Sequence, residues 1–388
     1  MPEIDVAPGP PAFRADVQAL RAMAVAVVVL YHAQLPGIHG GFLGVDVFFV
    51  ISGFVITGVL LRERQSSSRT SLVAFYGRRI RRILPIATLV LVVTVMASYH
   101  YLGFIAGARS AHDAYWVALF LGNFHFASVG TDYFGANLPP STLQQYWSLA
   151  VEEQFYLVWP LLFAAIAAGS TAGRQRRRLL LALVAIMAAS LAWSIIETSQ
   201  NQVWAFFSPL TRAWELALGA AIAVAGPWLA DRAPRIGLAL ASVGWLGIAL
   251  SCWLITSTTP WPGSAVIAPV LATGLVIAGG SMRVSASPGL LVRSGPVQWL
   301  GKVSYSLYLL HWPILTIAAQ YSLAPLSRPV ELGLVALALL ASALSYRFIE
   351  DPVRRSSLLK GRSELTYLMG AALIGISLLV AFIELGQP

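Results

Sequence analysis

The segment DVQALRAMAVAVVVLYHAQL, residues 16–35, has the length of roughly 20 residues that crosses a bilayer core as a helix, and most of its side chains are apolar. It nevertheless carries Arg21 and His32, eleven positions apart, which an α-helix brings to within about 20° of one face and separates by about 16 Å along its axis. Ionisable groups inside a bilayer usually face a polar cavity, so this face is a candidate site. The alternatives are an interfacial anchor for Arg21 and a structural hydrogen bond for His32.

The whole chain shares this apolar character. Of its 388 residues, 57% are hydrophobic and only 11% are charged, whereas soluble domains carry about 25% charged residues. Lipid must therefore be the solvent of this chain, and helices satisfy their own backbone hydrogen bonds there. The sequence lacks the alternating strands of about ten residues that are typical of outer-membrane barrels.

Ten further apolar segments resemble the first in length, and together they predict an all-α, polytopic transmembrane helical bundle. The domain prediction is a cytoplasmic N-terminal tail at 1–15, a transmembrane domain at 16–355, and a cytoplasmic linker with an additional eleventh helix at 356–388. A shorter apolar stretch, 114–126, predicts a re-entrant or interfacial helix. The eleven predicted spans are 16–35, 40–61, 84–102, 147–168, 179–197, 206–226, 236–256, 264–281, 303–322, 330–349 and 365–386.

The basic residues predict the orientation of the bundle. With the N-terminus in the cytoplasm, all Lys and Arg residues except Arg109, Arg212 and Arg328 fall in the tail, in inner loops or at inner ends of spans. A full span at 114–126 would move the cluster at 174–178 outside, so eleven spans are preferred. The C-terminus is then extracytoplasmic. Because topology accounts for the net charge of +9, no nucleic-acid partner is expected.

Residues 40–54, GGFLGVDVFFVISGF, start the second span. The glycines permit close contact between helices. Asp46 enters this span from the outer side at about the depth of His32, where a carboxylate could orient the imidazole, as in a catalytic triad. A helix N-cap is the alternative.

Residues 75–85, FYGRRIRRILP, place four arginines at the inner membrane face. Arg79 and Arg82 are one helical turn apart, and Arg78 and Arg81 have the same spacing. A guanidinium group suits phosphate oxygens. The alternative is an electrostatic anchor on anionic membrane lipid.

Residues 146–160, YWSLAVEEQFYLVWP, place Glu152 and Glu153 in the outer part of the fourth span, near the depth of His32. Buried carboxylates in a bilayer are candidate catalytic groups. Consecutive helical residues point about 100° apart, so at most one of the two faces a given cavity squarely.

Three more ionisable residues are candidates for binding substrate. Arg212 and Glu215, three apart in the sixth span, either pair with each other or extend the polar cavity. His311, in SYSLYLLHWP, either lines the same path or is a hydrogen-bonded core histidine.

We expect no metal site. The chain has one cysteine, Cys252, which excludes a cysteine cluster, and the histidines at 39, 100, 112 and 125 show no metal-ligand spacing. A His-Glu-x-x-His motif, a phosphate-binding glycine loop and a Gly-x-Ser-x-Gly elbow are also absent from the sequence.

Six motifs in order over residues 14–355 resemble the bacterial acyltransferase-3 family: Arg21-x10-His32, GGFLGVDVFFVISGFVIT, FYGRRIRRILP, YWSLAVEEQFYLVWP, SYSLYLLHWP and SYRFIEDPVRR. This family comprises membrane O-acyltransferases of surface polysaccharides, lipopolysaccharide and peptidoglycan, and some antibiotic-tailoring enzymes. The resemblance implies ten conserved spans in the bacterial cytoplasmic membrane, a coenzyme A thioester as donor and no metal.

The resemblance also implies roles for particular residues. The essential histidine of the family corresponds to His32 and its partner arginine to Arg21. The Arg-x-x-Arg pair of the family corresponds best to Arg79 and Arg82, with Arg78 and Arg81 as the alternative. The conserved glutamate of the fourth motif corresponds to Glu152 or Glu153, and that of the last motif to Glu350.

The expected reaction moves an acyl group, most economically acetyl, from cytoplasmic acyl-CoA to a hydroxyl of a surface glycan or lipid-linked saccharide. The alternatives are a transporter or flippase of such a glycan, and a small glycoside such as a macrolide as acceptor. The eleventh span resembles the family branch in which an SGNH-type extracytoplasmic domain follows. That domain is an expected partner, whether the chain is the membrane portion of a longer protein or a stand-alone variant.

Overall fold

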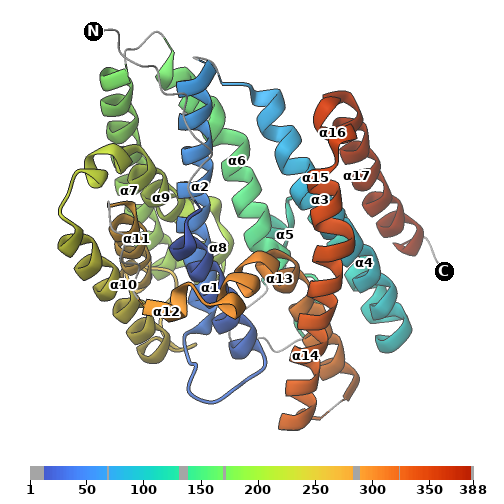
Figure 1. Cartoon of the computed structure of the whole chain (residues 1–388). Helices are drawn as coiled ribbons and strands as arrows, with labels where there is room; N and C mark the ends of the chain where they lie inside the picture. Colours follow the sequence, from blue (N-terminus) through green and yellow to red (C-terminus); the bar gives the residue numbers. More distant parts are fainter. Residues whose placement is uncertain are drawn as a thin grey trace, which may run out of the picture.

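The computed structural model describes residues 13–67, 70–130, 139–168, 172–282, 289–322 and 324–385, and within these ranges all regular secondary structure is helical (Figure 1). The predicted all-α fold is therefore confirmed. Most of the predicted N-terminal tail, residues 1–12, lies outside the described residues.

Each of the eleven predicted spans coincides with a helix of at least 15 residues. Nine helices among the described residues are long and apolar enough to cross a membrane, which makes the chain a multi-pass membrane protein. The helix of the eighth span has only 15 residues, and the 28-residue helix of the ninth is not among the nine. The long helices are α1 (Ala15–His32), α2 (Gly44–Ser67), α3 (Leu72–Leu102), α6 (Tyr146–Ala167), α7 (Ala172–Gln200), α9 (Pro209–Ala230), α10 (Pro234–Leu254), α11 (Ile267–Ser281), α13 (Gly295–Ser322), α14 (Arg328–Ser345) and α17 (Ser363–Leu385).

Short helices connect these elements. The 3-10 helix η1 precedes α2, and the π-helix η2 continues α14. The short helices are η1 (Gly41–Leu43), α5 (Gly122–Ser128), α8 (Gln202–Phe207), α12 (Gly289–Val292), η2 (Tyr346–Glu350), α15 (Asp351–Arg355) and α16 (Ser357–Gly361). A further connecting helix, α4 (Phe104–Ala118), has 15 residues, as many as α11.

Helix α3 begins at Leu72 rather than at residue 84 as expected. The hydroxyl of Ser71 accepts a hydrogen bond from the backbone N–H of Ala74 and caps the helix. The arginine cluster that precedes the predicted span is therefore helical, and its side chains are carried on the same rigid element as the apolar part of α3.

The single short helix predicted at 114–126 was wrong in extent. The structure has two helices there, α4 and α5, separated by a turn in which Phe120 has a φ of 55°. Residues 104–113, the first ten of α4, were missed because Arg109, His112 and Asp113 interrupt the apolar pattern there. Helix α4 packs against α3 and α17.

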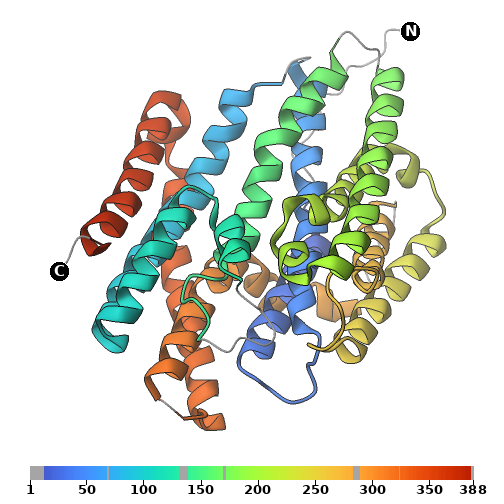
Figure 2. The same ribbon diagram turned by 180° about the vertical axis from the view of Figure 1, so that it is seen from behind.

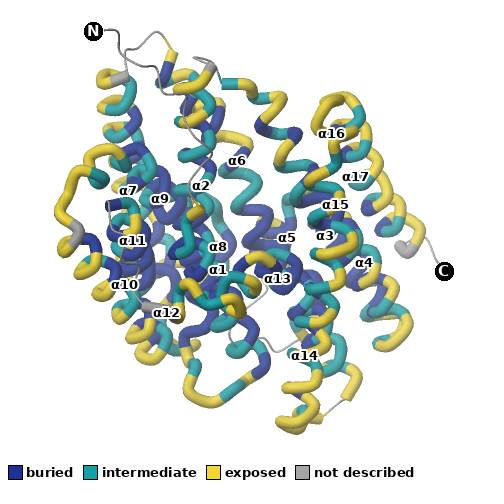
Figure 3. Tube along the Cα trace, viewed as in Figure 1, coloured by how far each residue is buried: buried dark blue, intermediate teal, exposed yellow. Residues whose placement is uncertain are grey.

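The helices form one bundle in which α1, α2, α6 and α13 lie between two groups (Figures 1 and 2). Helices α7, α9, α10 and α11 lie on one side, and α3, α4, α14 and α17 lie on the other. Buried residues concentrate where these groups meet, and exposed residues follow the outer faces (Figure 3). The outer faces carry large apolar side chains such as Leu246, Leu340 and Phe382, as a surface in lipid requires.

Helices α2 and α9 cross with no room for a side chain between their backbones. A Cβ atom on Gly53 would lie 1.8 Å from the carbonyl oxygen of Leu216, and one on Gly219 would lie 1.9 Å from that of Val50. No side chain fits at either position, so the expectation that the glycines of the second span permit close helix contact is confirmed for Gly53.

We expect Gly219→Ala to lower the thermal unfolding midpoint and the yield of folded protein, because the new methyl group forces α9 away from Val50. Gly226→Ala, on the same helix with no atom within 4 Å of the new methyl, is the matched control. It should be neutral or stabilise by up to about 1 kcal/mol, since Ala is the better helix former. Thermal unfolding of both purified variants in detergent checks this, and equal midpoints would contradict the close crossing.

Candidate active site

His32, at the end of α1, contacts two aromatic residues of α13. Its Nδ1 lies 3.0 Å from Nε2 of His311, and the two rings stack with centroids 5.2 Å apart. The ring of Trp312 meets His32 edge-on at 4.6 Å. His311 is completely buried.

The hydrogen bond between His311 and the backbone of Leu307 determines which ring nitrogens of His311 and His32 carry protons. The carbonyl oxygen of Leu307 can only accept, so Nδ1 of His311 donates to it, at 3.0 Å. In a neutral ring Nε2 of His311 is then the acceptor, and Nδ1 of His32 donates to it. Nε2 is therefore the basic nitrogen of His32, and His311 is the group that orients the ring.

His32 lines a cavity of about 1190 Å³, which we call the His32 cavity. Its walls carry aromatic, amide and hydroxyl groups, including Tyr31, Gln34, Tyr101, Trp312, Thr316 and Gln320. Flat rings for stacking and polar groups for hydrogen bonding suit a polar, hydroxylated ligand.

A second cavity, of about 370 Å³, is lined by the first half of α1 together with α3, α2, α6 and α13, and we call it the arginine cavity. Arg21, Arg79 and Arg82 line it together. Nη2 of Arg21 donates to the hydroxyl of Ser304 at 2.9 Å. Arg82 forms no hydrogen bond or ion pair with any described residue, so its charge is directed to the cavity itself.

Glu152 and Glu153 lie at the level of Arg79 and not near the depth of His32, where they were expected. Nη2 of Arg79 is 2.9 Å from Glu153 and 3.6 Å from Glu152, and the guanidinium lies 3.7 Å over the ring of Tyr156. The depth expected for the two glutamates was wrong because α3 begins before residue 84, and its added turns carry Arg79 to the level of the carboxylates. Of the two glutamates, Glu152 lines the cavity.

The other two arginines of the cluster are directed away from the cavity. The side chain of Arg78 is 43% exposed in a surface ion pair. Arg81 donates to the hydroxyl of Thr366 at 3.1 Å and so fastens α3 to α17. The Arg-x-x-Arg pair that lines the cavity is therefore Arg79 and Arg82.

Asp46 does not orient His32, which was the expected contact. Its carboxylate lies 2.6 Å from Nη1 of Arg212, and the same nitrogen lies 3.2 Å from Glu215. These three side chains are at most 2% exposed and line neither cavity, so of the two alternatives for Arg212 and Glu215 the structure shows the pair and not an extension of the polar cavity. The close crossing of α2 and α9 brings the guanidinium to Asp46, and a buried carboxylate takes the nearest cation.

Tyr308 connects the two cavities. It lines the arginine cavity, and its hydroxyl is 2.6 Å from that of Ser148 and donates to the carbonyl of Gln145 at 3.1 Å. Its ring lies 5.7 Å from the ring of His311, which in turn bonds to His32. A continuous series of side-chain contacts therefore runs from one cavity to the other.

Residues 14–347 match the family model of an acyltransferase domain, Acyl_transf_3. The chain belongs to the acyltransferase-3 family. It is 29% identical over 356 residues to the peptidoglycan O-acetyltransferase OatA of Listeria monocytogenes, an alignment that covers 88% of this chain and 56% of that protein. It is 29% identical over 353 residues to the O-acetyltransferase OatA of Staphylococcus aureus, with coverages of 89% and 58%. The chain thus spans little more than half the length of these relatives, and no solved structure matches it.

In this acyltransferase-3 chain the sequence pattern did not reveal the direct bond between His311 and His32, nor the contacts of Tyr308 and Trp312. A signal was present in SYSLYLLHWP. Tyr308 and His311 are three residues apart and share one face of α13. The partner helix for that face could not be read from the sequence.

We expect Arg212→Gln to destabilise the protein by about 3–5 kcal/mol, because it leaves Asp46 and Glu215 buried without their cation. Thermal unfolding followed by tryptophan fluorescence measures the loss. Arg78→Gln is the matched control, since it removes an arginine from an exposed pair with Glu63 that contributes about 0–1 kcal/mol. Equal thermal unfolding midpoints for the two variants would refute a structural role of Arg212 and its two buried carboxylates.

Proposed function

We propose that this chain is a membrane O-acetyltransferase that takes the acetyl group of acetyl-CoA in the arginine cavity and delivers it to a sugar hydroxyl in the His32 cavity. The observation that carries the proposal is that His32 lies between a polar cavity and a series of contacts leading to three arginines. The names of the two OatA relatives support acetyl as the group transferred. Family membership favours acyl transfer over the transporter alternative.

The distribution of basic residues supports the orientation. The arginine cavity belongs on the cytoplasmic side of the bacterial cytoplasmic membrane, because Arg-rich ends of spans remain inside. The His32 cavity then opens to the extracytoplasmic side. Donor and acceptor arrive from opposite sides of the membrane and meet at His32.

The donor site depends on charge. Coenzyme A carries phosphates that match guanidinium groups, and Arg82 is directed to the cavity without an ion pair among the described residues. Arg79 is held rigidly by Glu152, Glu153 and Tyr156, so it keeps its position without a ligand. The pantetheine arm would pass Arg21 and Tyr308 toward His32.

His32 acts as a general base in the first of two routes. Its Nε2 accepts the proton of the sugar hydroxyl, the oxygen attacks the thioester carbonyl, and coenzyme A leaves as a thiolate that takes up the proton. In the second route Nε2 attacks the thioester carbonyl and coenzyme A leaves as a thiolate. The sugar hydroxyl then takes the acetyl group from Nε2, and its proton passes to the thiolate. In both, His311 accepts a hydrogen bond from Nδ1 and stabilises the positive ring that forms.

The acceptor is a glycan, and peptidoglycan is the acceptor in the name of the Listeria relative. The rings and amides of the His32 cavity suit a saccharide, whereas a macrolide would use mainly the rings. An SGNH-type extracytoplasmic domain would be the partner that acts on the same glycan. Mass spectrometry of surface glycans with and without this protein identifies the acceptor.

We expect His32→Ala to lower acetyl transfer roughly 10²- to 10⁴-fold, the usual contribution of a general base. Transfer of labelled acetyl from acetyl-CoA to glycan in membrane vesicles measures the rate at matched protein abundance. His100→Ala, an exposed histidine of α3, is the control and should retain activity. Unchanged acetylation by His32→Ala would refute the assignment, and a transporter would leave the glycan chemically unmodified in every sample.

We expect the double variant Arg79→Gln with Arg82→Gln to weaken binding of acetyl-CoA at least about tenfold, since each charged hydrogen bond contributes about 1.5–3 kcal/mol. Titration calorimetry with the detergent-purified chain provides the affinity. Arg78→Gln is the control from the same cluster, directed away from the cavity. Undiminished binding by the double variant would mean that the cluster is only a lipid anchor.

A further inference from the structure

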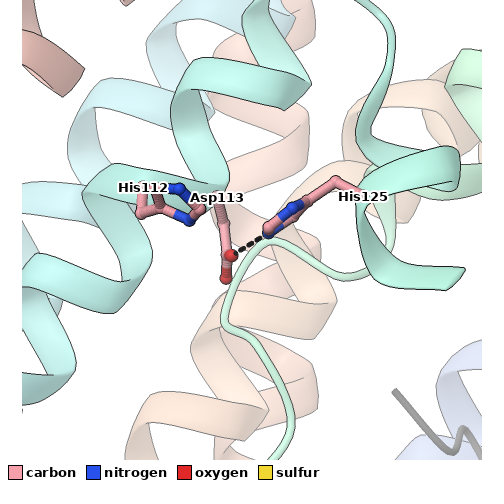
Figure 4. Close-up of side chains that lie close together, drawn as sticks. All are labelled: His112, Asp113 and His125. Atoms are coloured by element: carbon pink, nitrogen blue, oxygen red, sulfur yellow. Dashed lines mark hydrogen bonds and ion pairs between the residues drawn. The ribbon is translucent and has the colours of Figure 1, made fainter. Parts of the chain in front are cut away.

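His112, Asp113 and His125 come together between α4 and α5 (Figure 4). His112 and Asp113 are neighbours on α4, and His125 faces them from α5. Each offers one ligand atom, and these atoms all lie within 4.8 Å of one another. Nε2 of His125 is 2.8 Å from Oδ1 of Asp113. The sequence did not predict this cluster, because it depends on the turn between α4 and α5.

The surroundings hold the two buried members in fixed orientations. Asp113 and His125 are 5% and 7% exposed, and the second carboxylate oxygen of Asp113 accepts a hydrogen bond from Ser141 at 2.5 Å. The ring of Trp116 stacks on that of His125, with an angle of 8° between their planes. Outer contacts of this kind orient the ligands of metal sites.

His112 is the unexplained member of the cluster. It is exposed, lines an open groove of about 610 Å³ with Leu378 and Leu379 of α17, and forms no hydrogen bond with a described residue. Its ring centroid lies 5.0 Å from that of His125, so a small rotation brings a nitrogen toward the same point as the other two ligands.

We propose that His112, Asp113 and His125 bind one zinc ion, with a water molecule in the fourth position. Two imidazole nitrogens and one carboxylate oxygen form an established three-ligand set for zinc, at about 2.0–2.2 Å from the ion. On binding, the proton between Nε2 of His125 and Asp113 leaves to solvent, Nδ1 carries the proton of the neutral ring, and the ion takes the vacated place between the two groups. The exposed His112 is the ligand that closes the site.

A zinc ion at this position would affect the structure around the His32 cavity. Ser141, which bonds to Asp113, also accepts a hydrogen bond from the indole of Trp312 through its carbonyl at 2.8 Å. Trp312 in turn meets the ring of His32. Zinc would therefore hold together α4, α5 and the segment of Ser141 that supports a wall of the His32 cavity.

The test uses the full chain in detergent, stripped with EDTA and dialysed, and zinc chloride as the probe. We expect calorimetry and elemental analysis to give one zinc per chain. His112→Gln should weaken the affinity by at least roughly 10- to 100-fold, the effect of losing even an outer contact of a metal site. The side chain of His112 is exposed and has no hydrogen bond to a described residue, so this variant should fold, and gel filtration checks that it does.

His100→Gln, an exposed histidine of α3 outside the cluster, is the matched control and should bind zinc as the unmodified chain does. Absence of stoichiometric zinc from the unmodified chain would overturn the proposal. So would equal affinities of His112→Gln and His100→Gln, because the bond between Asp113 and His125 would then be only a clamp between two helices. Both outcomes are read from zinc binding, and acetyl transfer is measured in its own assay, so the two proposals fail separately.

Discussion

The buried guanidinium of Arg212 is the constraint on which the centre of this bundle depends. It lies between the carboxylates of Asp46 and Glu215 and also donates to the carbonyl of Phe206, with almost no exposure to solvent. A charge in such a place is tolerated only with partners in good geometry. Those partners come from α2, from α9 itself and from α8, so their positions relative to one another are fixed.

The crossing of α2 and α9 makes that geometry available. Because Gly53 and Gly219 have no side chains, the two backbones approach until each helix touches the carbonyl groups of the other. One face of α2 packs against α9, and its other faces contact α1 and α6. Ser52, next to Gly53, donates to Glu152 at 2.6 Å, so the same helix that supports the ion pair also lines the arginine cavity.

The chemistry is divided between the two ends of α1. Arg21, in its first half, lines the arginine cavity, and His32, at its last residue, lines the other cavity. Helix α13 packs along α1 and supplies a partner at each level, Ser304 for the arginine and His311 for the imidazole. The packing of α13 along α1 therefore fixes the position of the Arg21 guanidinium and the orientation of the His32 imidazole.

The sequence by itself determined the helical membrane fold, the common face of Arg21 and His32, and the arginine cluster beside the third span. These follow from local properties: apolar length, helical period and the order of motifs. Only the tertiary structure decided that Asp46 pairs with Arg212, that Glu152 and Glu153 hold Arg79, and that His311 orients His32. The reason is physical, because each of these contacts joins different helices, and helical periodicity specifies the face of a side chain but not which helix packs against that face or at what depth.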